Sequence, residues 1–569
     1  MAVPSSKTVG RRTLLLTLGT LVSRLLGMVR ETLIAASFSV LETDAFFIAW
    51  RIPNALRALL AEGALSAALV PIFSSTLLRG DAAFAPAPPK APPEGRPTDA
   101  DSQSEIEQLR ITNHLALRTV VARLRALSLA VLVPLSALGV LFAEPVMRFL
   151  VGDFGGDAAR FGLAVHLLRQ LFPYIFFMGS AAVGVGTLQS LGRFGALAFA
   201  PALLNVSFLV APVAFVPLAV SLHRPAVDGL AWAALLGGAL QLAALLPSLY
   251  RLDLLPRPVL DLRHPAVRKA LALMGPQLFT VAIYQIDVVL SNRFLASLPG
   301  GATSWFSYAQ RIADIPQGLF ILAIANSFLP ELSRAMKADD RQSAAEMVGA
   351  MLSLATFVAV PVAAILASYG EAVVPLIYGY GRFHSAGPGA IVAVVASLRW
   401  QAVNVALLAM VRQLTAAFAA AQNTRTPAVI SALDLVAFIA LAATLKAPLG
   451  HAGIAAAIAG STLVQLALLA VALKREIAVP WRRVSETLVK SLVASAAAVL
   501  AARLLVGVVP WQRATLSARI VCLAGGALLG TVYLLAAWLL RIPELNALRA
   551  RLLRNRRVAA LAKRLGLTA

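Results

Sequence analysis

The sequence predicts an all-α polytopic membrane protein. Apolar residues make up 59% of the 569 positions and charged residues only 14%, and the mean hydropathy is +0.79, which does not suit a soluble protein. Uncharged runs such as 197–222 and 230–250 are long enough to cross about 30 Å of hydrocarbon as helices. A transmembrane β-barrel would instead show short segments of alternating polarity.

Polar breaks divide the chain into about 14 predicted transmembrane helices. They lie near 12–38, 43–78, 111–142, 157–190, 196–221, 226–250, 267–297, 301–336, 342–368, 387–420, 427–446, 450–473, 485–508 and 516–541. Basic residues crowd the connections at 251–269 and 474–490, whereas the connection at 296–304 carries no charge. The positive-inside rule then places the N-terminus in the cytoplasm, and an even number of spans returns the C-terminus there.

Two polar segments differ from the other connections. Residues 79–110 are rich in Pro, Ala and acidic residues and are expected to form a disordered cytoplasmic loop. Its Asp99-Ala100-Asp101 has the spacing of some glycosyltransferase metal sites, but two unrelated aspartates in a flexible segment are the favoured interpretation. The tail 546–569 is basic, which favours contact with anionic membrane lipids over binding of a nucleic acid.

Charged residues lie inside the first two predicted spans, where they are costly. They are Arg24, Arg30, Glu31, Asp44, Arg51, Arg57 and Glu62. A charge at the bilayer centre costs roughly 2.5–3.5 kcal/mol on insertion scales, so seven that faced lipid would cost on the order of 20 kcal/mol. Because that exceeds the stability of a typical fold, we expect most of them to face one another or a water-filled cavity.

The second half of the chain repeats part of this pattern. Phe46, Ala49, Arg51, Ile52, Pro71 and Ser74 recur, at nearly one offset, as Phe306, Ala309, Arg311, Ile312, Pro330 and Ser333. The recurrence predicts two six-helix halves, a plan in which transporters bind substrate between the halves. Pro53 and Pro316 follow the repeated arginines and predict a bend beside each cation, although prolines in such helices also serve packing alone.

The balance of intramembrane charges indicates the substrate class. Arginines slightly outnumber carboxylates, and the planar guanidinium binds phosphate oxygens bidentately, which favours a phosphate or diphosphate substrate. Arg311 and Asp314, three residues apart, also fit a structural ion pair. The chain has no P-loop or H-E-x-x-H motif, and its single Cys522 offers no disulfide or metal framework, so we expect a transporter without a cofactor rather than an enzyme.

Ordered motifs over about residues 20–475 resemble the MurJ (MviN) family of lipid II flippases. They are Ser23-Arg24-Leu25-Leu26-Gly27-x-x-Arg30, Thr43-Asp44-Ala45-Phe46-Phe47, Pro53-Asn54-x-x-Arg57, Ala61-Glu62-Gly63-Ala64, Phe172-Pro173-Tyr174, Pro201-Ala202-Leu203-Leu204-Asn205, Ser304-Trp305, Tyr378-Gly379, Gly381-Arg382-Phe383 and Thr426-Pro427. The resemblance implies the exporter fold of the multidrug/oligosaccharidyl-lipid/polysaccharide (MOP) superfamily. It also implies a role in peptidoglycan biosynthesis in the bacterial cytoplasmic (inner) membrane.

The resemblance carries specific expectations for this chain. An N-terminal lobe at 1–250 and a C-terminal lobe at 251–475 would be followed by two further spans at 476–545, which offer a groove for a polyprenyl tail, and by the basic tail at 546–569. The substrate would be lipid II, an undecaprenyl diphosphate that alternating access moves from the inner to the outer leaflet. The expected substrate-binding residues are Arg24, Arg30, Arg57 and Arg311, with Asp44 and Glu62 as acidic companions, and the internal repeat adds Arg51. We expect a monomer.

The sequence leaves two candidates for the ion that drives transport, Na⁺ and the proton. Some relatives bind a cation through an acidic residue matched by Asp287, together with Asn or Asp at positions where this chain has Phe438 and Ala442. Asp434, one helical turn earlier, is the candidate replacement ligand for Na⁺; alternatively, Asp287 titrates and couples transport to protons. Gln310 stands where many relatives have an acidic residue, so any pairing of the neighbouring arginine falls to Asp314 in the same helix.

Two other functions compete with the flippase interpretation. Another MOP-type exporter, moving a different polyprenyl-diphosphate glycan or a drug, would share the fold, but the dense block 24–62 resembles MurJ specifically. A membrane glycosyltransferase would need acidic catalytic groups at a membrane face, and the sequence shows no convincing set.

Overall fold

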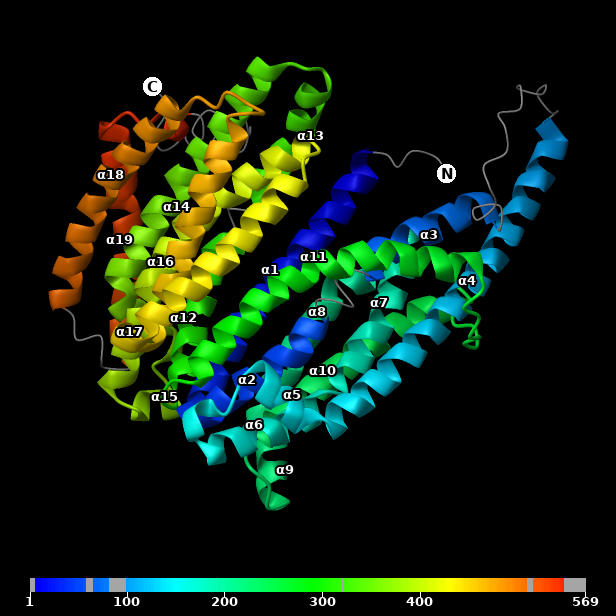
Figure 1. Cartoon of the computed structure of the whole chain (residues 1–569), viewed down its shortest axis with the longest axis horizontal. Helices are drawn as coiled ribbons and strands as arrows, with labels where there is room; N and C mark the ends of the chain where they lie inside the picture. Colours follow the sequence, from blue (N-terminus) through cyan, green and yellow to red (C-terminus); the bar gives the residue numbers. More distant parts are fainter. Residues whose placement is uncertain are drawn as a thin grey trace. The chain divides into compact units, whose positions relative to one another are not determined.

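The structure is a computed structural model, and it describes residues 6–57, 65–80, 99–193, 195–318, 322–508 and 515–546. Over these residues the chain forms helices and no strand, which confirms the predicted all-α class (Figure 1). The chain divides into two compact units, Met1–Gly300 and Gly301–Ala569.

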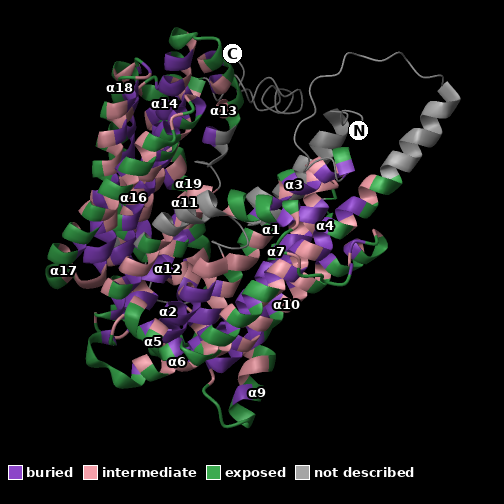
Figure 2. Cartoon of the chain, turned by 45° about the vertical axis from the view of Figure 1, so that its right-hand side comes forward, coloured by how far each residue is buried: buried purple, intermediate pink, exposed green. Residues whose placement is uncertain are grey.

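The first unit is a bundle in which α7 and α10 hold central positions. Its helices are α1 (Ser6–Ser37), α2 (Val40–Arg57), α3 (Leu65–Arg79), α4 (Asp99–Leu141), α5 (Ala143–Leu150), α6 (Ala158–Leu171), α7 (Tyr174–Ser190), α8 (Gly195–Val210), α9 (Val216–Ser221), α10 (Asp228–Arg251) and α11 (Pro265–Ala296). α10 packs against α7 and α8, α7 also packs against α3 and α4, and α1 lies along α8. Leu69, Phe73, Leu117, Val121 and Leu245 meet in its buried apolar core (buried positions are purple in Figure 2).

The second unit is organised around α14. Its helices are α12 (Ala302–Pro316), α13 (Leu322–Lys337), α14 (Arg341–Tyr378), α15 (Gly381–Ser385), α16 (Pro388–Ala420), α17 (Arg425–Leu473), α18 (Trp481–Val508) and α19 (Leu516–Leu539). α14 packs along both α16 and α18, and α17 packs against α16. Val348, Leu352, Leu414, Phe418 and Leu469 form part of its core, so the apolar faces of three long helices are buried against one another.

Nine helices or continuous helical stretches in the described part are long and apolar enough to cross a membrane. They include α14, α16, α17 and α18 of the second unit. This supports a polytopic membrane protein, whereas the total of about 14 spans stays a prediction.

α17 is counted once among those nine, yet it contains a sharp turn. Gly450 has φ 57° and ψ −134°, a conformation open to glycine but not to residues with a Cβ. Gly453 permits a close approach, because a Cβ there would lie 2.1 Å from the carbonyl oxygen of Leu445. The two arms, 425–449 and 451–473, coincide with the predicted spans at 427–446 and 450–473.

The structure corrects part of the predicted disordered loop at 79–110. α4 begins at Asp99, so residues 99–110 are helical, and residues 81–98 lie outside the described part. Asp99 and Asp101 stand in the first turn of this helix. The following Glu105 and Glu107 are good helix formers, which the interpretation as a disordered loop undervalued.

The internal repeat appears as the same helix order in both units. α2 carries Arg51 and precedes α3 with Pro71, and α12 carries Arg311 and precedes α13 with Pro330. The predicted lobe boundary near residue 250 stays a prediction. In the structure α11 belongs to the first compact unit.

The basic connection 252–264 is fastened to α4. Arg123 Nε donates to Asp261 Oδ2 at 3.1 Å, and Arg125 Nη1 donates to the carbonyl oxygen of Pro256 at 2.8 Å. The hydrogen bond from Arg123 lowers the pKa of Asp261, and backbone hydrogen bonds from Arg263 and His264 act in the same direction. This carboxylate is therefore ionised at neutral pH and orders the connection before α11.

Candidate functional site

Arg30 on α1 belongs to a polar network that joins α1 to α8. Its Nη1 donates to Asn205 Oδ1 at 2.9 Å, and its Nη2 forms an ion pair with Glu31. Asn205 Nδ2 in turn donates to the carbonyl oxygen of Ser23 at 2.8 Å. The guanidinium carbon also lies 5.4 Å from the centre of the Phe208 ring. Three contacts thus fix the position of this cation, and the bond to Ser23 holds its partner Asn205 in place.

This arrangement can bind an anion. The Arg30 side chain is 15% exposed, whereas that of its partner Glu31 is 5% exposed. A guanidinium carries five donors, and those not used by the network can reach a phosphate oxygen. Because the side chain is already ordered, binding costs less conformational entropy than it would for a free arginine.

Asp44 on α2 forms an enclosed ion pair that no sequence pattern predicted. Its side chain is fully buried, and Arg160 Nη1 on α6 donates to its Oδ2 at 3.2 Å. Arg160 Nη2 donates to the carbonyl oxygens of Phe154, Ala296 and Leu298 at 3.2, 2.6 and 3.0 Å. One guanidinium therefore joins α2, α6 and the end of α11. The substrate-binding role of Asp44 stays a prediction; in this structure its carboxylate belongs to a buried structural pair.

The sequence contained only a weak signal for Arg160. It lies near the start of the predicted span at 157–190, where a basic residue is expected at the membrane interface. The structure places its side chain at 4% exposed. Asp157, three residues earlier, caps α6 by accepting from the Arg160 backbone N–H at 3.0 Å, and this i, i+3 acidic partner was the available hint.

The remaining predicted residues of α1 and α2 differ in exposure. Arg24 is exposed on α1, and Arg51 and Arg57 are half-buried on α2. Arg57 Nε donates to Asn54 Oδ1 at 3.0 Å, a bond within one helical turn that orients the guanidinium. Glu62 lies outside the described residues.

Aromatic residues fix the buried face of α2. Trp50 lies 4.8 Å from the Tyr174 ring and 5.9 Å from the Phe208 ring, measured between ring centres. Phe46 also contacts Phe208, at 6.1 Å. Since Phe208 lies beside Arg30 as well, the same ring packs against both α2 and the polar network of α1.

In the second unit, Arg311 lies on the exposed side of α12 and Asp314 is half-buried. The backbone of α12 is fastened at two points: Tyr378 Oη donates to the carbonyl oxygen of Tyr308 at 3.1 Å, and Gln401 Nε2 donates to that of Phe306 at 3.2 Å. α12 is thus held by α14 and α16, which positions its arginine.

The two candidate coupling residues lie on different helices. The backbone of Asp287 is in α11, while its side chain is outside the described part. Asp434 is half-buried on α17, and Phe438 and Ala442, one and two turns on, are buried. Ser461, on the second arm of α17, is the hydroxyl neighbour of Asp434.

Comparison with known proteins decides the family. The family model described as lipid II flippase MurJ matches residues 34–524. The chain belongs to the lipid II flippase MurJ family. The MurJ protein of Burkholderia cenocepacia is 31% identical over 462 residues, which cover 80% of this chain and 82% of that protein. A probable lipid II flippase MurJ of Bdellovibrio bacteriovorus is 31% identical over 475 residues, covering 82% and 83%.

Solved structures support the MurJ fold. A structure of lipid II flippase MurJ in an inward closed conformation matches with a TM-score of 0.69 at 18% identity, over 91% of this chain and 98% of that one. An inward-facing multidrug transporter of the MATE family and MOP superfamily matches with a TM-score of 0.59 at 15% identity, over 82% and 95%. These matches confirm the fold that the family resemblance implied.

Proposed function

We propose that this chain is a lipid II flippase that moves the undecaprenyl-diphosphate-linked peptidoglycan precursor across the bacterial cytoplasmic membrane by alternating access. The family match over residues 34–524 carries the proposal, and curated relatives similar over about four-fifths of the chain bear the name lipid II flippase MurJ. The family is one of transporters rather than catalysts. We further propose that both termini face the cytoplasm, that the protein acts as a monomer, and that its basic tail contacts anionic lipids.

The chemistry of α1 and α2 supports a diphosphate cargo. The Asn205 contact and the Glu31 ion pair orient Arg30, and Asn54 orients Arg57. A diphosphate offers several oxygens to guanidinium donors, and each charge-assisted hydrogen bond is worth roughly 1.5–3 kcal/mol. Arg24, Arg51, Arg57 and Arg311 are the further proposed ligands, with Asp44 and Glu62 as acidic companions.

A multidrug exporter of the same superfamily is the second candidate. The MATE-family structure resembles the fold but not the sequence, at 15% identity. The relatives at 31% identity are all MurJ proteins, which favours the flippase.

Native mass spectrometry of the purified protein tests this proposal. Lipid II and bare undecaprenyl phosphate are offered in competition to the wild type and to Arg57→Ala. We expect selective retention of lipid II by the wild type and about tenfold weaker retention by the variant, from the loss of one charge-assisted contact. Equal retention of both lipids by both proteins would favour another exporter. In cells, the wild-type gene should restore growth when the resident flippase is depleted.

Asp287→Asn tests the coupling ion. The substitution keeps the shape of the side chain but removes its charge and its titration, so a carboxylate that binds Na⁺ or a proton can no longer do so. We expect the flipping rate in vesicles to lose its dependence on either a sodium or a proton gradient. Asp434→Asn, measured in parallel, shows whether Asp434 is itself a ligand of the coupling ion: a ligand alters the dependence on the ion gradient when it is replaced, and a residue without that role does not. An unchanged rate in Asp287→Asn under both gradients would contradict either form of coupling through this residue.

A further inference from the structure

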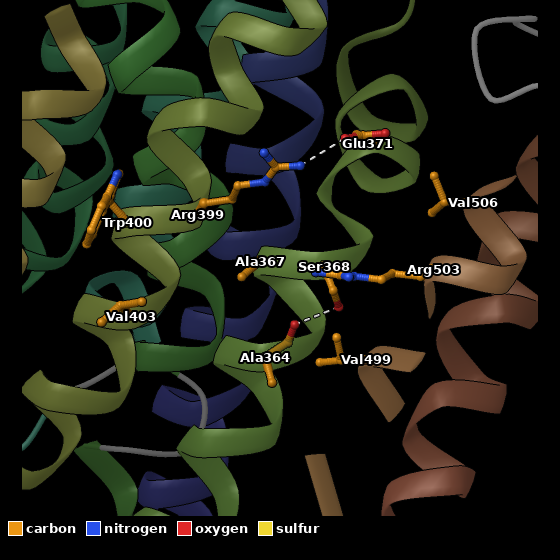
Figure 3. Close-up of a pocket in the computed structure, with 10 residues that line it drawn as sticks. All are labelled: Ala364, Ala367, Ser368, Glu371, Arg399, Trp400, Val403, Val499, Arg503 and Val506. Carbon is orange, nitrogen blue, oxygen red and sulfur yellow. Dashed lines mark hydrogen bonds and ion pairs between the residues drawn. The ribbon is translucent and has the colours of Figure 1, made fainter. Parts of the chain in front are cut away.

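A cavity of about 860 Å³ lies in the second unit between α14, α16 and α18 (Figure 3). Its lining comprises Ala364, Ala367, Ser368, Glu371, Arg399, Trp400, Val403, Val499, Arg503 and Val506. The volume falls in the range of small-molecule sites. All three helices are long and apolar enough to cross a membrane, so this is a polar cavity between spanning helices.

Two guanidinium groups and one carboxylate provide its polar chemistry. Arg399 Nη2 on α16 donates to Glu371 Oε1 on α14 at 2.9 Å. Arg503 extends from α18 toward α14 on the other side of the cavity (Figure 3). The Arg503 guanidinium makes no hydrogen bond or ion pair with any residue that the structure describes. The lining therefore carries one cation in excess.

The depth of these groups matches a lipid headgroup. With a rise of 1.5 Å per residue, Glu371 lies about 10 Å before the end of α14, Arg503 about 8 Å before the end of α18, and Arg399 about 16 Å after the start of α16. These three helix ends lie toward the same end of the second unit (Figure 1). Helices of 28 to 38 residues exceed the hydrocarbon thickness, so charges at this depth lie near its boundary.

The surroundings match the rest of such a ligand. Trp400 is 42% exposed beside the cavity, and an indole at this depth is typical of the membrane interface. On α18, Leu500 and Leu504 flank Arg503 and are 63% and 67% exposed. The Arg399 and Glu371 side chains are 56% and 47% exposed, so the cavity is open. A cationic cavity beside exposed leucines can bind a ligand that has both an anionic head and an apolar chain.

We propose that Arg503 and Arg399 bind the phosphate group of an anionic membrane lipid in this cavity. Phosphate oxygens accept from the fork of Arg503 and from the Arg399 donors not used by Glu371. Glu371 orients Arg399 and lowers the net positive charge of the cavity lining from two to one. The lipid is either a bilayer phospholipid or the diphosphate-bearing substrate; only the second source rests on the proposed function.

Binding is measured on the full-length protein by native mass spectrometry, with phosphatidylglycerol against a neutral glycosyl diacylglycerol of the same acyl chains. We expect the wild type to retain phosphatidylglycerol preferentially and Arg503→Gln to weaken its retention about tenfold, since charge-assisted hydrogen bonds are lost. Arg412→Gln, an exposed arginine on α16 outside the cavity, is the matched control and should behave as wild type. Equal retention of the two lipids by the wild type, or wild-type retention by Arg503→Gln, would overturn the proposal.

Glu371→Gln gives an independent result of opposite sign. Removing the carboxylate leaves two cations in the cavity, so phosphatidylglycerol should be retained several-fold more tightly. Unchanged or weaker retention would contradict the site, and this variant serves even where Arg503→Gln does not fold. Arg503→Lys, which keeps the charge without the fork, should bind with intermediate strength.

Lipid II added without phosphatidylglycerol identifies the source. Weaker retention of lipid II by Arg503→Gln assigns the cavity to the substrate diphosphate, and unchanged retention assigns it to a bilayer phospholipid. Failure of lipid II to bind any of the proteins would contradict the flippase proposal while leaving the phosphatidylglycerol result intact.

Discussion

Arg30→Ala is expected to abolish lipid II transport while the protein still inserts and folds. The guanidinium is held in place by Asn205, Glu31 and Phe208, which surround it. Its loss removes one or more charge-assisted hydrogen bonds to the diphosphate. The affinity for lipid II should therefore fall about 10- to 100-fold. The substitution also removes the guanidinium that forms an ion pair with the buried Glu31 carboxylate. Flipping in reconstituted vesicles and lipid II retention by native mass spectrometry measure both consequences.

Two further variants separate positioning from charge. Arg30→Lys keeps the positive charge but cannot reach Asn205 and Glu31 with one planar fork, so partial transport is expected. Asn205→Ala removes the orienting amide and leaves the cation, so substrate affinity should fall less than in Arg30→Ala. Arg148→Ala on α5, an exposed arginine paired with Glu144, is the matched control. Full transport by a folded Arg30→Ala protein would remove this residue from the site.

Arg160→Met is expected to destabilise the first unit by ~3–5 kcal/mol, the usual cost of breaking a buried ion pair by removing one partner. Its side chain is 4% exposed, and the guanidinium contacts Asp44 together with three backbone carbonyl oxygens. Without it, the buried carboxylate loses its guanidinium partner and the carbonyls lose a shared donor. Thermal unfolding of the purified protein in detergent should show a clear fall in midpoint.

A double-mutant cycle tests whether that loss comes from the pair. Asp44→Asn removes the negative charge, so the double variant Asp44→Asn with Arg160→Met should be less destabilised than the sum of the two single variants. Arg148→Met breaks an exposed pair and should change stability by about 1 kcal/mol at most. Strict additivity of the two buried substitutions would show that Asp44 and Arg160 act independently.

Family, fold class and the location of the key cations could be read from the sequence because they depend on local information. Apolar run length predicts spans, and ordered motifs such as Ser23–Arg30 predict the family. The adjacent Arg30 and Glu31 were both singled out, and the structure pairs them. Partners distant in the chain could not be assigned, because helix periodicity gives the face of a residue but not the helix that packs on it.

Arg160 and Asn205 illustrate this limit. Asn205 lies in a motif that supported the family resemblance, yet its contact with Arg30 spans 175 positions and depends on how α1 packs on α8. Arg160 was not among the predicted site residues, because burial of a cation depends on the carbonyl groups that tertiary packing brings to it. The cavity of Arg399 and Arg503 was missed for the same reason: each helix contributes one charged residue.

The turn at Gly450 has a consequence for membrane topology. As one straight helix, α17 would be about 74 Å long, more than twice the hydrocarbon thickness, whereas each arm of about 35 Å matches a single crossing. The turn therefore divides one continuous helical run into two arms, each long enough to cross the hydrocarbon once. When both arms cross the bilayer, α18 and α19 run across it in the direction opposite to the one that a straight α17 would give them. The two glycines at 450 and 453, which permit the turn, thus set the direction in which α18 and α19 would cross.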